Sequence, residues 1–235
     1  MSIKTSTLMS NILAIDSSSK GCAVCIRTES HTLTRKSEDQ RAAAQSLLPY
    51  IDELVVEAGI QLKELNLIAV AAGPGSFTGI RIGIGIAQGL GESLQIPVLP
   101  VSSLSLLAWE AAGLSEARYV SAALFARAEE FYFANLEVSP NEGVTVLAAE
   151  TVADLTDFNV SNGIPVGAAP WVVAGDAWDK IPGLGDAAGE LPRQLAQGAT
   201  SVTALAELAF LHHQKGTYDD HLPLPNYVKE QLDYS

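Results

Sequence analysis

Short continuous apolar runs alternate in the first half of the chain with longer segments in which apolar residues recur every third or fourth position. Continuous runs bounded by turn residues are typical of buried strands, and the longer periodicity is typical of helices that bury one side. The runs predict strands over residues 12–16, 22–27, 67–72 and 96–101. The periodic segments predict helices over residues 40–58 and 78–94. This order of strands and helices predicts an α/β fold in which helices cover a sheet.

The second half of the chain has weaker patterns. Its apolar segments predict strands over residues 118–126, 130–138, 144–149 and 171–175. Helices are predicted over residues 102–112, 151–155 and 201–215, with Gly216 as the C-cap of the last. Turn-forming residues predict loops over 159–170 and 181–199 and an extended surface tail over 221–235.

The most unusual segment is GPGSFTGIRIGIGIAQGL, residues 73–90. Its first three residues end the preceding strand, and Ser76 or Thr78 offers a side-chain oxygen to cap the helix that follows. A Gly in a helix interior costs about 1 kcal/mol relative to Ala. The helix nevertheless carries glycines at i,i+4 spacing, as the pairs Gly79/Gly83 and Gly85/Gly89. We interpret the pairs as stripes along which another backbone approaches closely.

The same helix is apolar on more than one side. Ile80, Ile84 and Ala87 form one stripe at helical spacing, and Ile82 and Ile86 lie on another side. A helix of this kind must be covered by its own sheet and also by something else. The pattern therefore predicts an interface with a second polypeptide.

The loop that opens this helix has a second interpretation, an anion site. Backbone N–H groups at a helix start favour a negative charge, so Gly73, Gly75 and Ser76, with Asp16 nearby, are candidate residues for a weakly bound anion or nucleotide. The loop lacks the Lys-Ser/Thr of a Walker A motif and is not a GxGxxG motif. Asp16 either supplies a catalytic or metal-binding carboxylate or caps its own turn, and we favour the cap.

The composition of the chain excludes some classes of function. Hydrophobic residues make up 48% of the chain and charged residues 17%, which indicates a globular protein. The net charge of −13 argues against autonomous nucleic-acid binding. The apolar runs are too short and too rich in Gly to span a bilayer, and no secretory signal is visible, so a cytoplasmic protein is expected. Cys22 and Cys25 would point to opposite faces of a strand, so we expect structural thiols.

Three segments carry a resemblance to one family. The segments GPGSFTGIRIGIGIAQGL, LAIDSSS (13–19) and VSSLSLLA (101–108) resemble the bacterial TsaB family, also called YeaZ. The resemblance implies a two-lobed α/β fold of the actin/sugar-kinase/Hsp70 kind. It implies a first lobe of residues 1–101 and about 198–235 with the interface helices, and a smaller lobe of residues 102–197. It also implies a role in forming N6-threonylcarbamoyladenosine at adenosine 37 of tRNAs that read ANN codons.

The resemblance further implies that this subunit does not catalyse the transfer, which belongs to the paralogue TsaD. TsaD binds a metal through a His-x-x-x-His motif, and at the matching positions this chain has Ser103 and Leu107. Neither residue replaces an imidazole, so no metal, no cofactor and no catalytic residue is expected.

The family instead uses the two helices for partner binding. The resemblance places the partner-binding surface on residues Leu47, Tyr50, Ile51, Leu54, Ser76, Phe77, Thr78, Gly79, Arg81, Ile82, Gly83 and Ile86. The implied partners are a TsaD-like paralogue and a TsaE-like ATPase, with a homodimer when the protein is alone and tRNA reached only through the complex. Two rival functions stay open: an actin-like ATPase or phosphotransferase that uses Asp16 and the loop at 73–78, and a metallopeptidase-like hydrolase.

Overall fold

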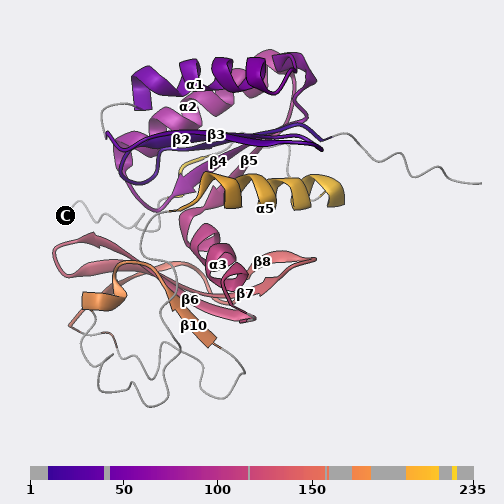
Figure 1. Cartoon of the computed structure of the whole chain (residues 1–235). Helices are drawn as coiled ribbons and strands as arrows, with labels where there is room; N and C mark the ends of the chain where they lie inside the picture. The colour runs from indigo at the N-terminus through magenta and orange to yellow at the C-terminus, as the bar shows by residue number, and fades with distance from the viewer. Residues whose placement is uncertain are drawn as a thin grey trace, which may run out of the picture.

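The structure is a computed structural model, and it describes residues 10–39, 43–115, 117–156, 158, 171–180, 200–216 and 224–226. The predicted start of the first helix at Gln40, the loops at 159–170 and 181–199, and most of the tail lie outside these residues. Within them, the chain forms two sheets, each with helices packed against it (Figure 1).

The first sheet has five strands in the order β3-β2-β1-β4-β5. Its strands are β1 (Ile12–Asp16), β2 (Cys22–Arg27), β3 (Thr32–Ser37), β4 (Leu67–Gly73) and β5 (Val98–Ser102). β1 pairs with β4, and β4 with β5, in parallel, whereas the β1–β2 and β2–β3 pairs are antiparallel. The central strands β1 and β4 are buried along their whole length, as their continuous apolar runs predict.

Helices cover both faces of this sheet. α1 (Ala43–Glu57) and α2 (Phe77–Leu94) pack on one face, and α5 (Val202–Lys215) packs on the other, as Figure 1 shows. Between β4 and α1 lies the short 3-10 helix η1 (Leu62–Glu64). α1 is one continuous helix across Pro49, and α5 ends at Gly216, which has the left-handed φ of 62° typical of a C-cap.

The second sheet contains the remaining strands. β6 (Tyr119–Arg127) and β7 (Glu130–Ser139) form an antiparallel hairpin, β10 (Trp171–Ala174) pairs in parallel with β6, and β8 (Gly143–Val146) and β9 (Thr151–Asp154) both pair with β7. α3 (Ser103–Gly113) packs on one face of this sheet, towards α5 and the first sheet. An aromatic cluster that includes Phe131 and Trp178, the latter in the 3-10 helix η2 (Trp178–Lys180), covers the other face.

The structure differs from the sequence predictions at two strands. The helix predicted over residues 151–155 is the strand β9, because Thr151–Asp154 pair with the edge of β7 and this pairing overrides a weak local pattern. β3 was not predicted at all. Its residues, TLTRKS, alternate between exposed and partly buried positions and contain a single large apolar residue, so they form no apolar run.

Candidate functional site

The β1–β2 turn packs directly against the start of α2. Asp16 ends β1 and is buried, and its Oδ1 accepts hydrogen bonds from the N–H of Ser18 at 2.8 Å and from the Ser18 hydroxyl at 2.7 Å. Its Oδ2 accepts a hydrogen bond from the hydroxyl of Thr200, just before α5. The carboxylate thus caps its own turn and ties that turn to a distant segment, as expected for the turn-capping interpretation.

The glycines at the start of α2 leave room for this turn. A Cβ at Gly75 would overlap the carbonyl oxygen of Ser18, and one at Gly79 would overlap the carbonyl oxygen of Ser17. A Cβ at Gly83 would lie 2.6 Å from the hydroxyl oxygen of Ser17. The Gly79/Gly83 stripe does admit another backbone, but that backbone belongs to the same chain.

Polar groups of the loop are also paired within the chain. Ser76 is the N-cap of α2 and its hydroxyl accepts from the Gly79 N–H at 3.3 Å. The Ser76 N–H donates to the carbonyl of Ser18 at 2.6 Å, and the Ser17 hydroxyl donates to the carbonyl of Gly79 at 2.8 Å. Two of the N–H groups on which an anion site would depend are therefore already used, beside a buried carboxylate. The anion site stays a prediction without support from these contacts.

A cavity of about 660 Å³ opens beside the loop, between the two sheets. Ser18, Gly75, Ser76 and Thr200 line it from the first sheet and its flanking segments, and Phe125 and Asp176 from the second. The cavity is large enough for a small molecule.

Of the two positions that the family resemblance aligns with the metal ligands of TsaD, Ser103 lines this cavity and Leu107 does not. Ser103 is buried, and its hydroxyl donates to the Ser18 hydroxyl at 3.3 Å. Leu107 is fully buried in the core between α3 and the second sheet. In the described part of the chain, no group of three or more His, Cys, Asp or Glu residues is arranged to hold a metal ion.

The predicted partner-binding residues fall into three classes of exposure. Ser76, Phe77, Thr78 and Arg81 are exposed on the outer side of α2, with the Arg81 guanidinium 3.2 Å from the centre of the Phe77 ring. Tyr50, Ile82 and Ile86 are partly buried where the two helices pack on the sheet.

The remaining five residues are buried, which corrects the prediction that they lie on the partner-binding surface. Leu47, Ile51 and Leu54 point into the chain's own core, and Gly79 and Gly83 face the β1–β2 turn. Leu47, Ile51 and Leu54 recur at the helical spacing of the buried side of α1, and that spacing accounts for their burial.

Four exposed apolar or small residues lie on these helices: Leu48 and Val56, which were not predicted as site residues, and Gly85 and Gly89, which belong to the predicted glycine stripes. Leu48 and Val56 on α1 are apolar and 50% and 80% exposed. On α2, a Cβ at Gly85 or Gly89 would meet no described atom within 4 Å. In the sequence, these apolar or small residues lie outside the stripe that each helix buries, and that position could have identified them.

The two cysteines lie on opposite faces of β2, as expected. Cys22 faces the core under α1 and α2, and Cys25 faces the core under α5. Burial raises the pKa of the Cys22 thiol, with a smaller effect from the Asp16 carboxylate, and burial raises the pKa of Cys25 to about 12. Both thiols therefore stay protonated near neutral pH and are poor nucleophiles.

Comparison with known proteins identifies the family. Residues 34–182 match the family model for tRNA N6-adenosine threonylcarbamoyltransferase, TsaD, so the chain contains a TsaD-type domain. It is also 35% identical over 178 residues to the tRNA threonylcarbamoyladenosine biosynthesis protein TsaB of Escherichia coli, an alignment that covers 76% of either chain. The chain belongs to the TsaB/YeaZ family. A similar relative, TsaB of Haemophilus influenzae, is 38% identical over 125 residues, about half (53%) of either chain.

Two solved structures have the same fold. A Pseudomonas aeruginosa protein described as similar to peptidase YEAZ superimposes with a TM-score of 0.81 at 33% identity, over 94% of this chain and 100% of that one. YeaZ from the same species superimposes with a TM-score of 0.74 at 31% identity, over 88% and 95% of the two chains. The predicted α/β fold class and the family resemblance are thereby confirmed. No described helix has the length and apolar character to cross a membrane.

Proposed function

We propose that this chain is a non-catalytic scaffold subunit of the complex that transfers threonylcarbamoyl to adenosine of ANN-decoding tRNAs. It binds a TsaD-like paralogue through the outer sides of α1 and α2. The observation that carries the proposal is the open pair Gly85/Gly89. Each glycine costs about 1 kcal/mol against Ala in a helix interior, and nothing in the described chain requires its lack of a side chain.

A second helix packed closely against α2 would explain why both positions are glycine. Small residues at i,i+4 spacing let two helix backbones approach closely. Beside the glycines, the exposed ring of Phe77 and the apolar side chains of Leu48 and Val56 offer surface for burial. Exposed apolar groups of this size on adjacent helices are typical of protein interfaces.

The absence of catalysis is proposed from Ser103 and Leu107. A serine hydroxyl that is hydrogen-bonded in the core and a buried leucine offer no imidazole to a metal. The chemistry of the transfer would then belong to the partner, and this chain would hold that partner in an active arrangement.

The wider assignment follows the family. We propose two lobes, residues 1–101 with 198–235 and residues 102–197, with the interface helices in the first. The same surface would form a homodimer when the protein is alone, and a TsaE-like ATPase would join the complex. With a net charge of −13, the chain would leave tRNA contact to its partners, in the cytoplasm.

The test replaces the open glycines by a bulky residue. The double variant Gly85→Trp/Gly89→Trp should fold normally and should no longer form a complex with a TsaD-like paralogue, measured by light scattering of the mixed proteins. Lys63→Trp is the control, because Lys63 of η1 is exposed and lies outside both the proposed interface and the two cavities. Complex formation by the double variant with undiminished affinity would falsify the interface.

One observation favours a second candidate function, nucleotide binding in the cavity beside Ser18, Gly75 and Thr200. Calorimetric titration of the isolated chain with ATP and Mg²⁺ tests it. Tight binding, lost in a Lys20→Glu variant that reverses the charge of an exposed side chain lining the cavity, would favour the ATPase or phosphotransferase alternative.

A further inference from the structure

A second and larger cavity lies on the side of the molecule away from the outer surface of α1 and α2. It has a volume of about 1350 Å³ and is enclosed by α3, α5 and the edge formed by β6, β7 and β8. Trp109 and Ala112 line it from α3, Ala117 from the segment before β6, and Val138 from β7, with the exposed side chain of Leu114 at the rim. We call this cavity the α3–α5 groove.

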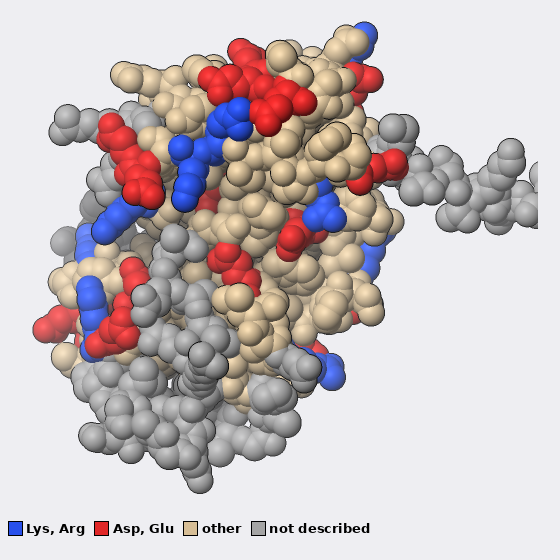
Figure 2. Space-filling model, in the orientation of Figure 1, with Lys and Arg blue, Asp and Glu red and all other residues tan. Residues whose placement is uncertain are grey.

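The groove is strongly acidic. Its lining contains the carboxylates of Glu110, Glu137, Glu142 and Glu207 and a single cationic side chain, Arg118. Arg118 pairs with Glu137, to which its Nε donates at 2.6 Å, and Glu142 pairs with Lys215 of α5 at 3.2 Å. On the described surface in Figure 2, acidic and basic side chains both occur, many of them next to one another.

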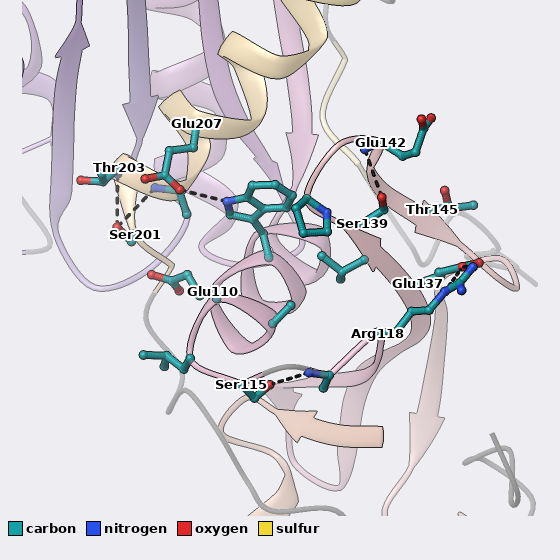
Figure 3. Close-up of a pocket in the computed structure, with 18 residues that line it drawn as sticks. Glu110, Ser115, Arg118, Glu137, Ser139, Glu142, Thr145, Ser201, Thr203 and Glu207 are labelled. Atoms are coloured by element: carbon teal, nitrogen blue, oxygen red, sulfur yellow. Dashed lines mark hydrogen bonds and ion pairs between the residues drawn. The ribbon is translucent and has the colours of Figure 1, made fainter. Parts of the chain in front are cut away.

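Two of the four carboxylates have no cationic partner among the residues that the structure describes. Glu110 of α3 and Glu207 of α5 lie on the same side of the groove, opposite Arg118 and Glu137, as Figure 3 shows. Glu207 accepts a hydrogen bond from the indole N–H of Trp109 at 3.0 Å, and Glu110 is hydrogen-bonded to Ser201. No Lys or Arg in the described ranges forms an ion pair with either carboxylate.

The electrostatic environment of Glu110 is unfavourable for its charged form. Burial raises the pKa of Glu110 to about 7, and the carboxylates of Asp16 and Glu207 add to the shift against the hydrogen bonds from Ser201. Two carboxylates beside one indole, without a countercharge, form a site that a cation would stabilise.

We propose that the α3–α5 groove binds a basic segment of a partner polypeptide, with one Arg or Lys side chain placed between Glu110 and Glu207 beside Trp109. The aliphatic part of that side chain would lie on the apolar wall formed with Ala112 and Ala204. Neighbouring apolar residues of the segment would cover Leu114 and Val138.

The dimensions favour a polypeptide over a small amine. Pockets for small molecules usually measure about 300 to 1,000 Å³, and this groove is larger. Its polar groups are also distributed over its length, from Ser201 and Glu207 on one side to Glu142 and Thr145 on the other. A single small cation would fill only the end at Glu110 and Glu207. This proposal does not depend on the proposed function, since the groove is separate from the outer sides of α1 and α2.

The test is calorimetric titration of the full chain with a short synthetic peptide of repeated Arg-Ala-Leu units, at moderate salt. The variants Glu110→Gln and Glu207→Gln keep the hydrogen bonds to Ser201 and Trp109 and remove the charges. We expect each to weaken binding about tenfold, and the double variant more. The matched control, Glu29→Gln/Asp52→Asn, removes two charges from exposed positions and should change binding little.

A pH series gives a second readout. Peptide affinity should rise from pH 6 to pH 8 as Glu110 ionises, and Glu110→Gln should flatten that rise. The other ionisable groups around the groove are Asp16, Glu207, Arg118, Glu137, Glu142 and Lys215.

The proposal fails if the peptide does not bind, or if the control pair weakens binding as much as the Glu110 and Glu207 variants, which would mean nonspecific attraction to an acidic protein. It also fails if spermidine binds as tightly as the peptide and displaces it, because the occupant would then be a small amine.

Discussion

The two sides of α2 carry the same residue type at the same spacing and meet opposite surroundings. On the inner side, Gly79 and Gly83 lie so close to the β1–β2 turn that a Cβ would overlap Ser17 or crowd its hydroxyl. On the outer side, Gly85 and Gly89 face open space. A glycine stripe alone therefore does not say whether the approaching backbone belongs to the same chain or to another one.

The largest expected effect is on the inner side. Gly79→Ala places a Cβ against the Ser17 carbonyl, a backbone group that cannot move aside cheaply. We expect a loss of about 3 kcal/mol or more in the free energy of unfolding, measured by urea denaturation. A loss below about 1 kcal/mol would mean that the turn can shift and that the inner contact is not tight.

Substitutions on the outer side of α2 should raise the free energy of unfolding, whereas Gly79→Ala lowers it. Gly85→Ala and Gly89→Ala should each stabilise the isolated protein by up to about 1 kcal/mol, because Ala favours the helix and its Cβ meets no described atom. The same urea titrations measure it. Destabilisation by either substitution would mean that the outer side is covered within the chain.

The dependence of stability on pH tests how far Glu110, in the open groove, is nevertheless shielded from water. Its pKa is raised from 4.5 to about 7, so the folded state binds this proton more tightly than the unfolded state does. Its contribution to stability is therefore present at low pH and is lost as pH rises from about 4.5 through 7.

Relative to Glu110→Gln, the wild type should lose roughly 1 to 2 kcal/mol over that range, after a reduction for the partial exposure of the side chain. Urea titrations of both proteins at several pH values measure the difference. A constant difference from pH 4.5 to pH 8 would contradict the raised pKa.

An effect well below that of Gly79→Ala is expected at the helix cap. Ser76→Ala removes the hydroxyl that accepts from the Gly79 N–H and should destabilise the protein by about 1 kcal/mol. Ser76→Asp should retain most of the stability, since a carboxylate also caps a helix start. If Ser76→Ala is neutral in thermal unfolding, the β1–β2 turn alone holds the start of α2.

The strands β1 and β4 and the helices α1, α2 and α5 could be predicted because each has a strong local pattern, a continuous apolar run or a stripe at helical spacing. β3 and β9 could not, because each depends on pairing with a neighbouring strand more than on its own residues. For the candidate site, the sequence pointed to the helices over residues 40–58 and 78–94, and their role in partner binding stays a prediction. The sequence could not separate Leu47 and Ile51, which are buried, from Leu48, which is exposed one residue away.

The order of residues was sufficient to indicate the α/β class, the family and the unusual composition of α2, because periodicity and motifs are local properties. Only the tertiary structure decided which glycines contact the chain's own turn. It also decided that Glu110 and Glu207 face one groove, because both features bring together segments that are far apart along the chain. Ser17 and Gly79 are 62 positions apart and yet share a hydrogen bond. Contacts of that kind arise from the packing of the sheet, its helices and its turns, and no local pattern records them.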